Sequence, residues 1–303
     1  MNERSIWEKI KKNKSVRILR EEIYTVSGYK VIIGLVIVLF YVGLAIAAPL
    51  LATHDPTQLG AGPDLETPSG EFFFGTTDLG QDLYSRILFG TRTALTVVLL
   101  ATAIAMSIGI PLGLISGYVG GKGDRVTLLV MDAMYSFPSI VLAILVVVAL
   151  EPGILPASAA VSVVYIPQYF RIIRNHVMSI KNEAFVKSAK AVGSSKKDTI
   201  LKYILPNVSQ SIPVILTLNA ADGILTLAGL SFLGLGVQPP NPSWGYDLNS
   251  AWSLLSIADN NPQVWYYSLI PGVAIVLLIV GFTLLGEGLN DILNPQLREG
   301  KRQ

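Results

Sequence analysis

Six long apolar runs decide what this chain can fold into. They are predicted at residues 31–51, 93–118, 126–150, 154–173, 204–230 and 265–285. A helix needs about 20 apolar residues to cross the hydrocarbon core of a membrane. Only 15% of the 303 residues are charged, which is too few to cover the surface of a soluble protein of this size. The sequence therefore predicts an all-α integral membrane protein with six transmembrane helices.

The first run could be mistaken for a cleaved signal peptide. A basic segment precedes it, and Ala45-Ile46-Ala47 resembles a cleavage site. However, the basic segment is long and five further runs follow. We therefore interpret residues 31–51 as a retained signal-anchor helix.

The positions of lysine and arginine predict the orientation. Of 23 such residues, 21 lie in the N-terminal segment, after the second run, between the fourth and fifth runs, and in the tail. Arg86 and Arg92 are the two exceptions. Because basic residues stay on the cytoplasmic side, both termini are predicted to be cytoplasmic. The loops 52–92, 151–153 and 231–264 then lie outside, and Trp244, Trp252 and Trp265 are expected near the outer interface.

These assignments divide the chain into five parts. Residues 1–30 form a basic cytoplasmic segment, 31–51 the first transmembrane helix, and 52–92 an extracytoplasmic loop. Residues 93–288 form the core, which includes cytoplasmic helices at about 174–203 and the loop 231–264. Residues 289–303 form a cytoplasmic tail.

The composition excludes several kinds of chemistry. The chain has no cysteine, and its two histidines, His54 and His176, fall on opposite sides of the predicted membrane. We therefore predict no metal site and no catalytic triad. No stretch fits the Walker A pattern, since Ser116 and Gly123 stand where glycine and Ser/Thr are required. No cofactor, enzymatic activity or nucleic-acid binding is expected.

The cytoplasmic segment between the fourth and fifth runs has the pattern of a helix–turn–helix. Asn182 is predicted to cap a first helix that has one apolar stripe, and Gly193 to end it. Ser195 and Asp198 resemble a capping box that opens a second helix, which continues through Leu205-Pro206 into the fifth run.

Two interpretations of this segment are open. Its lysines suit a helix that lies on lipid headgroups. Its small residues Ser188, Ala189 and Ala191 suit close contact with another protein. We favour protein docking, because lipid does not require small side chains.

The same segment resembles a family motif. Lys187-Ser188-Ala189, Gly193 and Leu205-Pro206 have the spacing of the EAA loop of binding-protein-dependent ABC importer permeases. Lys187 stands where that motif has glutamate, Ser188 replaces its first alanine, and Tyr203 takes its isoleucine position.

Further motifs resemble the C-type permease subunit of the peptide and nickel branch of this family. They occur in the same order along almost the whole chain. They are residues 74–82 (FGTTDLGQD), 230–240 (LSFLGLGVQPP), 242–245 (PSWG), Pro271-Gly272, 285–291 (LGEGLND) and Asn294-Pro295.

The resemblance implies a type I ABC importer (MetI-like) permease in a prokaryotic cell membrane. Its partners would be a second homologous permease, two ABC ATPase subunits, an extracytoplasmic substrate-binding protein and the lipid membrane. It would carry di- or oligopeptides, nickel chelates or oligosaccharides. The residues expected to couple it to the ATPases are Glu183, Lys187, Ser188, Ala189, Val192, Gly193, Leu205 and Pro206.

Three carboxylates, Asp132, Asp222 and Glu287, lie in or at the end of apolar runs. Such groups are functional candidates. We expect each to accept hydrogen bonds from neighbouring helices, because no repeated chain of acids and histidines suggests a proton relay. An ion-driven secondary transporter is the alternative function; it would need inverted repeats and paired carboxylates, which the sequence lacks. A membrane-embedded enzyme would need converging catalytic groups, which it also lacks.

Overall fold

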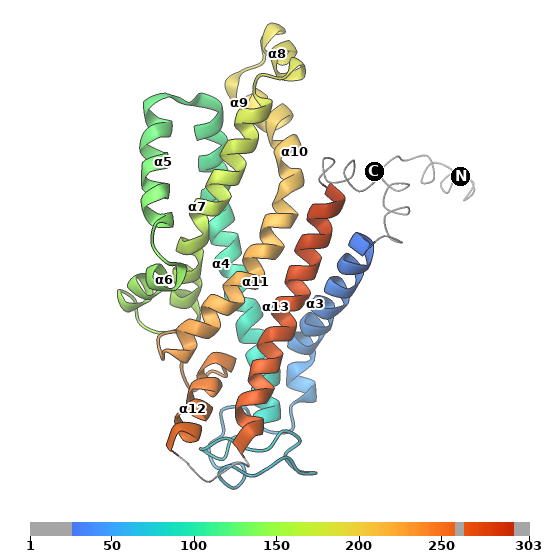
Figure 1. Cartoon of the computed structure of the whole chain (residues 1–303), viewed down its shortest axis with the longest axis vertical. Coiled ribbons are helices and arrows are strands. Elements are labelled where there is room, and N and C mark those ends of the chain that lie inside the picture. The colour runs from blue at the N-terminus through green and yellow to red at the C-terminus, as the bar shows by residue number, and fades with distance from the viewer. Residues whose placement is uncertain (1–25, 258–263, 294–303) are drawn as a thin grey trace, which may run out of the picture.

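The computed structural model describes residues 26–257 and 264–293, which form a helical bundle (Figure 1). No strand occurs among these residues, so the all-α prediction is confirmed for the described part of the chain. The long helices are α3 (Val26–Leu51), α4 (Leu83–Val119), α7 (Ile154–Ile180), α11 (Ile212–Phe232) and α13 (Trp265–Leu293). The shorter ones are α5 (Gly121–Tyr135), α6 (Ser139–Val148), α8 (Ala184–Ala191), α9 (Lys196–Asp198), α10 (Leu205–Val208) and α12 (Trp244–Ile257).

Four helical segments are long and apolar enough to cross a membrane: α3, α4, α13 and the nearly continuous helix 196–232. The pair α5 and α6 makes a fifth if it is counted as one broken span. Helix α7 has 27 residues but carries more polar side chains, and 13 of its residues are buried inside the bundle. A helix that is enclosed by other helices need not be apolar all round.

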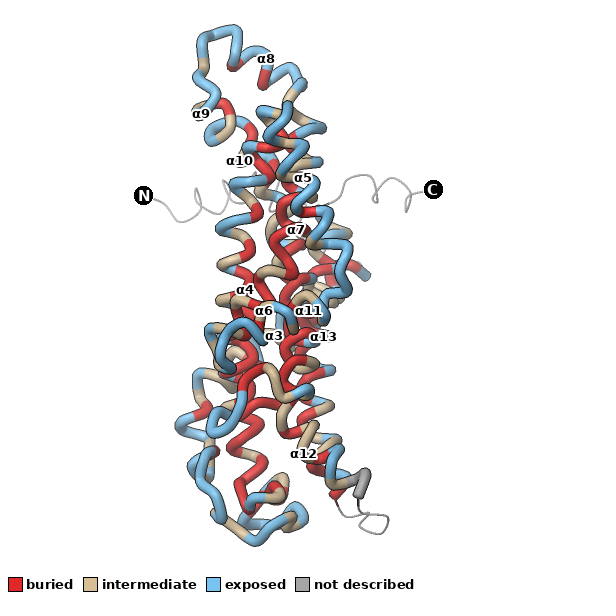
Figure 2. The backbone as a smooth tube through the Cα atoms, turned by 90° about the vertical axis from the view of Figure 1, so that its left-hand side faces the viewer, coloured by how far each residue is buried: buried red, intermediate tan, exposed pale blue. Residues whose placement is uncertain are grey.

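Close packing of α4 on α7 forms the centre of the bundle. Gly109, Gly113 and Gly117 recur every fourth residue and lie on one face of α4. A Cβ atom added at Gly113 would lie 2.7 Å from the carbonyl oxygen of Phe170, and one at Gly117 would lie 2.8 Å from that of Arg174. Small residues at this spacing let two helix backbones approach each other, as in membrane helix pairs. Figure 2 shows that the buried residues follow this central axis.

The third predicted span, 126–150, is interrupted in its middle. It is split into α5 and α6, whose axes differ by 95°. Pro138 lies at the break and has no N–H to continue the α5 ladder, so the chain turns there. Ser136 closes α5 by donating its N–H to the Asp132 carbonyl at 3.0 Å.

The predicted loop 52–92 is also too long, since α4 begins at Leu83. Asp82 caps this helix by accepting hydrogen bonds from the backbone N–H groups of Tyr84 and Ser85. The charge of Arg86 suggested a loop, but its side chain is buried. Nε and Nη2 of Arg86 donate to Asp247 Oδ1 at 3.0 and 2.6 Å.

The predicted loop 231–264 contains a helix, α12, in its middle. Asp247 on α12 is 1% exposed and ties this helix to the start of α4. Trp244 is buried, contrary to the interfacial position we expected, and its Nε1 donates to the Ile87 carbonyl at 3.1 Å. Trp252 and Trp265 are exposed, as an interfacial position requires.

The expectation that the three carboxylates accept hydrogen bonds from neighbouring helices is confirmed. Asp132 pairs with Arg171 at 2.6 Å, and Glu287 pairs with Lys30 at 2.7 Å. Asp222 accepts a hydrogen bond from the Tyr165 hydroxyl at 2.8 Å. Most of the predicted N-terminal segment and tail lies outside the described residues.

The helix contact predicts that Gly113→Leu destabilises the fold. The new side chain would meet the α7 backbone, and such overpacking typically costs about 1–3 kcal/mol. The matched control is Gly43→Leu on α3, where an added Cβ has no atom within 4 Å. Thermal unfolding in detergent should show a lower midpoint for Gly113→Leu alone. Equal midpoints for the two variants would contradict a glycine-dependent contact.

Candidate functional site

The predicted helix–turn–helix projects from one end of the bundle, opposite the outer loop and α12 (Figure 1). It consists of α8, a turn at 192–195, α9, and a π-helical stretch Thr199–Ile204 that leads into α10. Helix α7 continues to Ile180, so residues 174–180 belong to its end and not to the projecting segment. We call residues 181–206 the handle.

The start of α8 differs from the prediction. Glu183, not Asn182, is the N-cap residue, and its side chain makes no capping hydrogen bond. The extended backbone of Glu183 and its charge at the positive end of the helix remain consistent with a helix start.

The end of α8 agrees with the prediction. Gly193 has a φ of +86°, a conformation that side chains with a Cβ rarely adopt. The N–H of Gly193 bonds to the Lys190 carbonyl and that of Ser194 to the Ala189 carbonyl, both at 3.0 Å. These two bonds form a Schellman motif, which fixes the direction of the chain after the helix.

The second helix begins with the predicted Ser195–Asp198 cap. Ser195 Oγ accepts from the Asp198 N–H at 3.1 Å and donates to the Asp198 carboxylate at 2.6 Å. Asp198 also pairs with Lys202 at 2.7 Å, one turn later. Pro206 lacks an N–H and would crowd the preceding turn of an α-helix, and the π-helical stretch widens the helix just before it.

The inner face of the handle packs on the bundle. Val186 and Ile204 are fully buried, in a cluster with Leu114 of α4 and Val177 of α7. Ala189 is 4% exposed, so other parts of this chain cover its side chain.

Two basic residues strengthen this attachment. Lys181 Nζ donates to the Gly117 carbonyl at 2.9 Å, at the end of α4. Lys190 Nζ lies 5.0 Å from the centre of the Tyr118 ring. Nearby, Arg174 makes two hydrogen bonds to Asp124, at 2.6 and 2.8 Å, which join α7 to the start of α5.

The outer face of the handle is free in this chain. Val192 is 83% exposed and Phe185 is 39% exposed, so the outer face of the handle presents apolar side chains. Of the eight predicted residues, Ala189 is buried and Leu205 is half-buried. The exposed ones are Glu183, Lys187, Ser188, Val192, Gly193 and Pro206.

The turn predicts a specific effect of Gly193→Ala. An added Cβ has no atom within 4 Å, so the substitution causes backbone strain of about 1–2 kcal/mol and no clash. Hydrogen exchange at Gly193 and Ser194 should accelerate. Gly123→Ala, at another uncrowded glycine, should leave exchange in the handle unchanged. Unaltered exchange in Gly193→Ala would show that the positive φ is not needed.

Comparisons with known proteins agree with this architecture. Residues 109–299 match the family described as binding-protein-dependent transport system inner membrane component. The dipeptide transport system permease protein DppC of Alkalihalophilus pseudofirmus is 38% identical, with 88% of this chain and 86% of the relative covered. The glutathione transport system permease protein GsiD of Pectobacterium atrosepticum is 36% identical, with 93% and 90% covered.

A solved structure supports the fold. The MetNI methionine ABC transporter in an inward-facing conformation contains a chain that matches with a TM-score of 0.51 and 16% identity, covering 64% of this chain and 91% of that one. At this identity the similarity concerns the fold alone, and it confirms the predicted MetI-like arrangement. The chain belongs to the family of inner-membrane components of binding-protein-dependent transport systems, and it is a permease subunit of an ABC importer.

Proposed function

We propose that this permease forms one half of a transmembrane path for dipeptides or similar small peptides. The relatives named for dipeptide and glutathione transport cover most of the chain, which supports peptides over nickel chelates or oligosaccharides. A second homologous permease would form the other half, and an extracytoplasmic binding protein would deliver the solute.

Six membrane spans with both termini in the cytoplasm fit this proposal. Helix α7 would be the sixth span, because 27 residues at about 1.5 Å each reach about 40 Å. The first described residue, Val26, and the last, Leu293, both lie at helix ends that point toward the handle (Figure 1). Six of the described basic residues, Lys181, Lys187, Lys190, Lys196, Lys197 and Lys202, lie in the handle, as a cytoplasmic position requires.

ATP hydrolysis would take place on separate subunits that bind the handle. The observation that carries this proposal is a projecting helix whose inner face is fixed by Val186 and Ile204 while its outer face is free. A force on the outer face would pass through the π-helical stretch directly into α11. The handle can therefore act as a stiff lever, which a loop could not.

The outer end would receive the binding protein. Loop 52–82 and α12 lie together at this end, and the buried Arg86–Asp247 pair connects α12 to α4. Movement of α4 at the cytoplasmic end would thus reach the outer surface through rigid helices.

An ion-driven secondary transporter is less well supported. Asp132 and Glu287 are each paired with a basic side chain, and Asp222 is hydrogen-bonded to Tyr165. These carboxylates form no continuous relay among the described residues.

We expect Val192→Glu to uncouple the importer. The residue makes no internal packing that a charge would disturb, so the fold should survive, whereas an apolar contact with an ATPase would be lost. Loss of one interface anchor typically costs about 2 kcal/mol. Peptide-stimulated ATP hydrolysis of the reconstituted complex should therefore fall about tenfold or more, and Val192→Ile should retain it. Full stimulation by Val192→Glu, or absence of ATPase subunits from the purified wild-type complex, would contradict the proposal.

The orientation can be tested directly because the chain has no cysteine. Lys196→Cys in the handle and Thr67→Cys in the outer loop are both at exposed positions. A membrane-impermeant maleimide should label Thr67→Cys in intact cells. It should label Lys196→Cys only after the membrane has been permeabilised. Labelling of Lys196→Cys in intact cells would show that the handle lies outside the cell and that the proposed orientation is wrong.

A further inference from the structure

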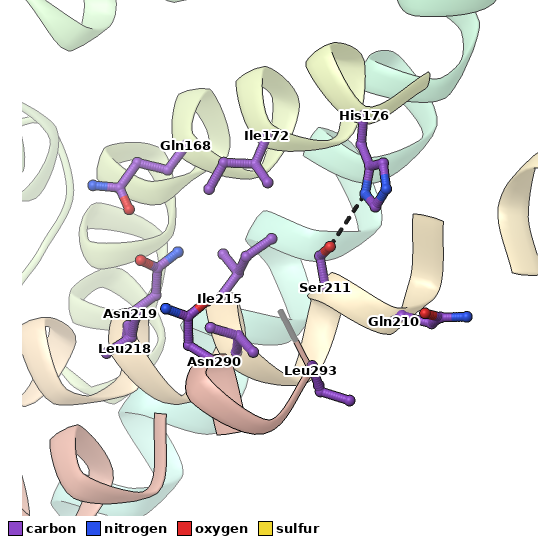
Figure 3. Close-up of a pocket in the computed structure, with 11 residues that line it drawn as sticks. Gln168, Ile172, His176, Gln210, Ser211, Ile215, Leu218, Asn219, Asn290 and Leu293 are labelled. Atoms are coloured by element: carbon purple, nitrogen blue, oxygen red, sulfur yellow. Dashed lines mark hydrogen bonds between the residues drawn. The ribbon is translucent and has the colours of Figure 1, made fainter. Parts of the chain in front are cut away.

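Two cavities lie along one side of α7 and α11. The larger, about 710 Å³, lies between α7, the start of α11 and the end of α13 (Figure 3). The smaller, about 220 Å³, lies where α5 breaks into α6, against α7 and α11. Gln168 lines both, so they adjoin at its side chain. We call the two together the polar groove.

A buried amide lines this groove. Asn219 is 6% exposed and belongs to the wall of the larger cavity. Its side chain interacts with the neighbouring Tyr169 hydroxyl. In Figure 3 the side chains of Asn219 and Gln168 point toward one another across the larger cavity. The larger cavity therefore has an amide side chain on each of two facing helices.

Asp222 supplies negative charge to the smaller cavity. It lies in the middle of α11 and its side chain is exposed. The Tyr165 hydroxyl donates a hydrogen bond to Oδ2 of Asp222 and so holds the carboxylate in place. The same hydroxyl lies 3.1 Å from the Thr226 hydroxyl. Among the described residues, no lysine or arginine pairs with Asp222 or lines either cavity.

The exposed position of Asp222 in the middle of α11 argues against a lipid contact there. A charged group in the hydrocarbon core is costly unless it faces water or protein. On α3, the exposed residues Val36, Leu39 and Phe40 are apolar. The exposed carboxylates Asp132 and Asp222 instead lie on α5 and α11. We therefore expect Asp222 to face water or protein.

We propose that the polar groove is this subunit's share of the solute path, and that Asp222 attracts the ammonium group of a passing peptide. This inference rests on the proposed function. Asn219 and Gln168 would exchange hydrogen bonds with peptide amides further along the groove. The His176–Ser211 hydrogen bond, at 3.1 Å, joins α7 to the segment before α11, at the end of the larger cavity that lies nearer the handle. An ammonium suits this groove because the described residues that line it include the carboxylate of Asp222 but no lysine or arginine.

The first test measures water access and the sign of the local charge. Ser139→Cys places a thiol in the smaller cavity beside Asp222, in a chain with no other cysteine. It should react with a cationic methanethiosulfonate faster than with an anionic one, in membranes that contain the assembled importer. Leu39→Cys on the apolar face of α3 should react slowly with both, and the unsubstituted chain gives the background. Combining Ser139→Cys with Asp222→Asn should lower the cationic-to-anionic rate ratio by about fivefold.

The second test measures transport. Uptake of dialanine by the reconstituted importer should fall several-fold in Asp222→Asn and recover in Asp222→Glu, which restores the charge. Dialanine should also protect Ser139→Cys from the cationic reagent while transport proceeds.

Three results would overturn the inference. An unreactive Ser139→Cys would show that the groove is sealed by a second permease or by lipid. A rate ratio that does not change in Asp222→Asn would show that the carboxylate does not set the charge. Normal dialanine uptake by Asp222→Asn would show that the peptide does not need it. The labelling requires no ATP hydrolysis, so it tests the groove even if the proposed coupling to ATPases fails.

Discussion

The close contact of α4 with α7 is the constraint on which the rest of this structure depends. Three glycines spaced four residues apart bring the two backbones together, and Phe170 and Arg174 of α7 lie against two of them. Where no hydrophobic effect drives helices together, such packing is a main source of association. The contact places the end of α4 beneath the handle, where Leu114 joins the cluster that holds α8.

The handle shows how a short projecting segment can be stiff. Its Schellman turn at Gly193, its Ser195 cap and its buried inner face leave few free backbone groups. The π-helical stretch before Pro206 then joins it to α11 without a loop. Because α11 also carries Asn219 and Asp222, a shift of the handle would move the wall of the polar groove itself. This gives a physical route from the handle to the polar groove.

The outer end depends on a different interaction. Arg86 and Asp247 are both buried, and removal of either would leave an unpaired charge in a dry site. Their pairing makes α12 part of the bundle instead of a surface loop. Stiff connections at both ends are what a channel needs if it is to alternate between two openings.

The sequence by itself determined the helical class, the predicted orientation and the handle. Run length, the placement of lysine and arginine, and cap residues such as Gly193 and Ser195 act locally and can be read from the chain. The tertiary structure alone decided that Arg86 is buried against Asp247, that Ala189 is buried, and that Asn219 and Asp222 line adjoining cavities. Each of these depends on which partner lies across the bundle, since burial and pairing are properties of neighbours distant in sequence.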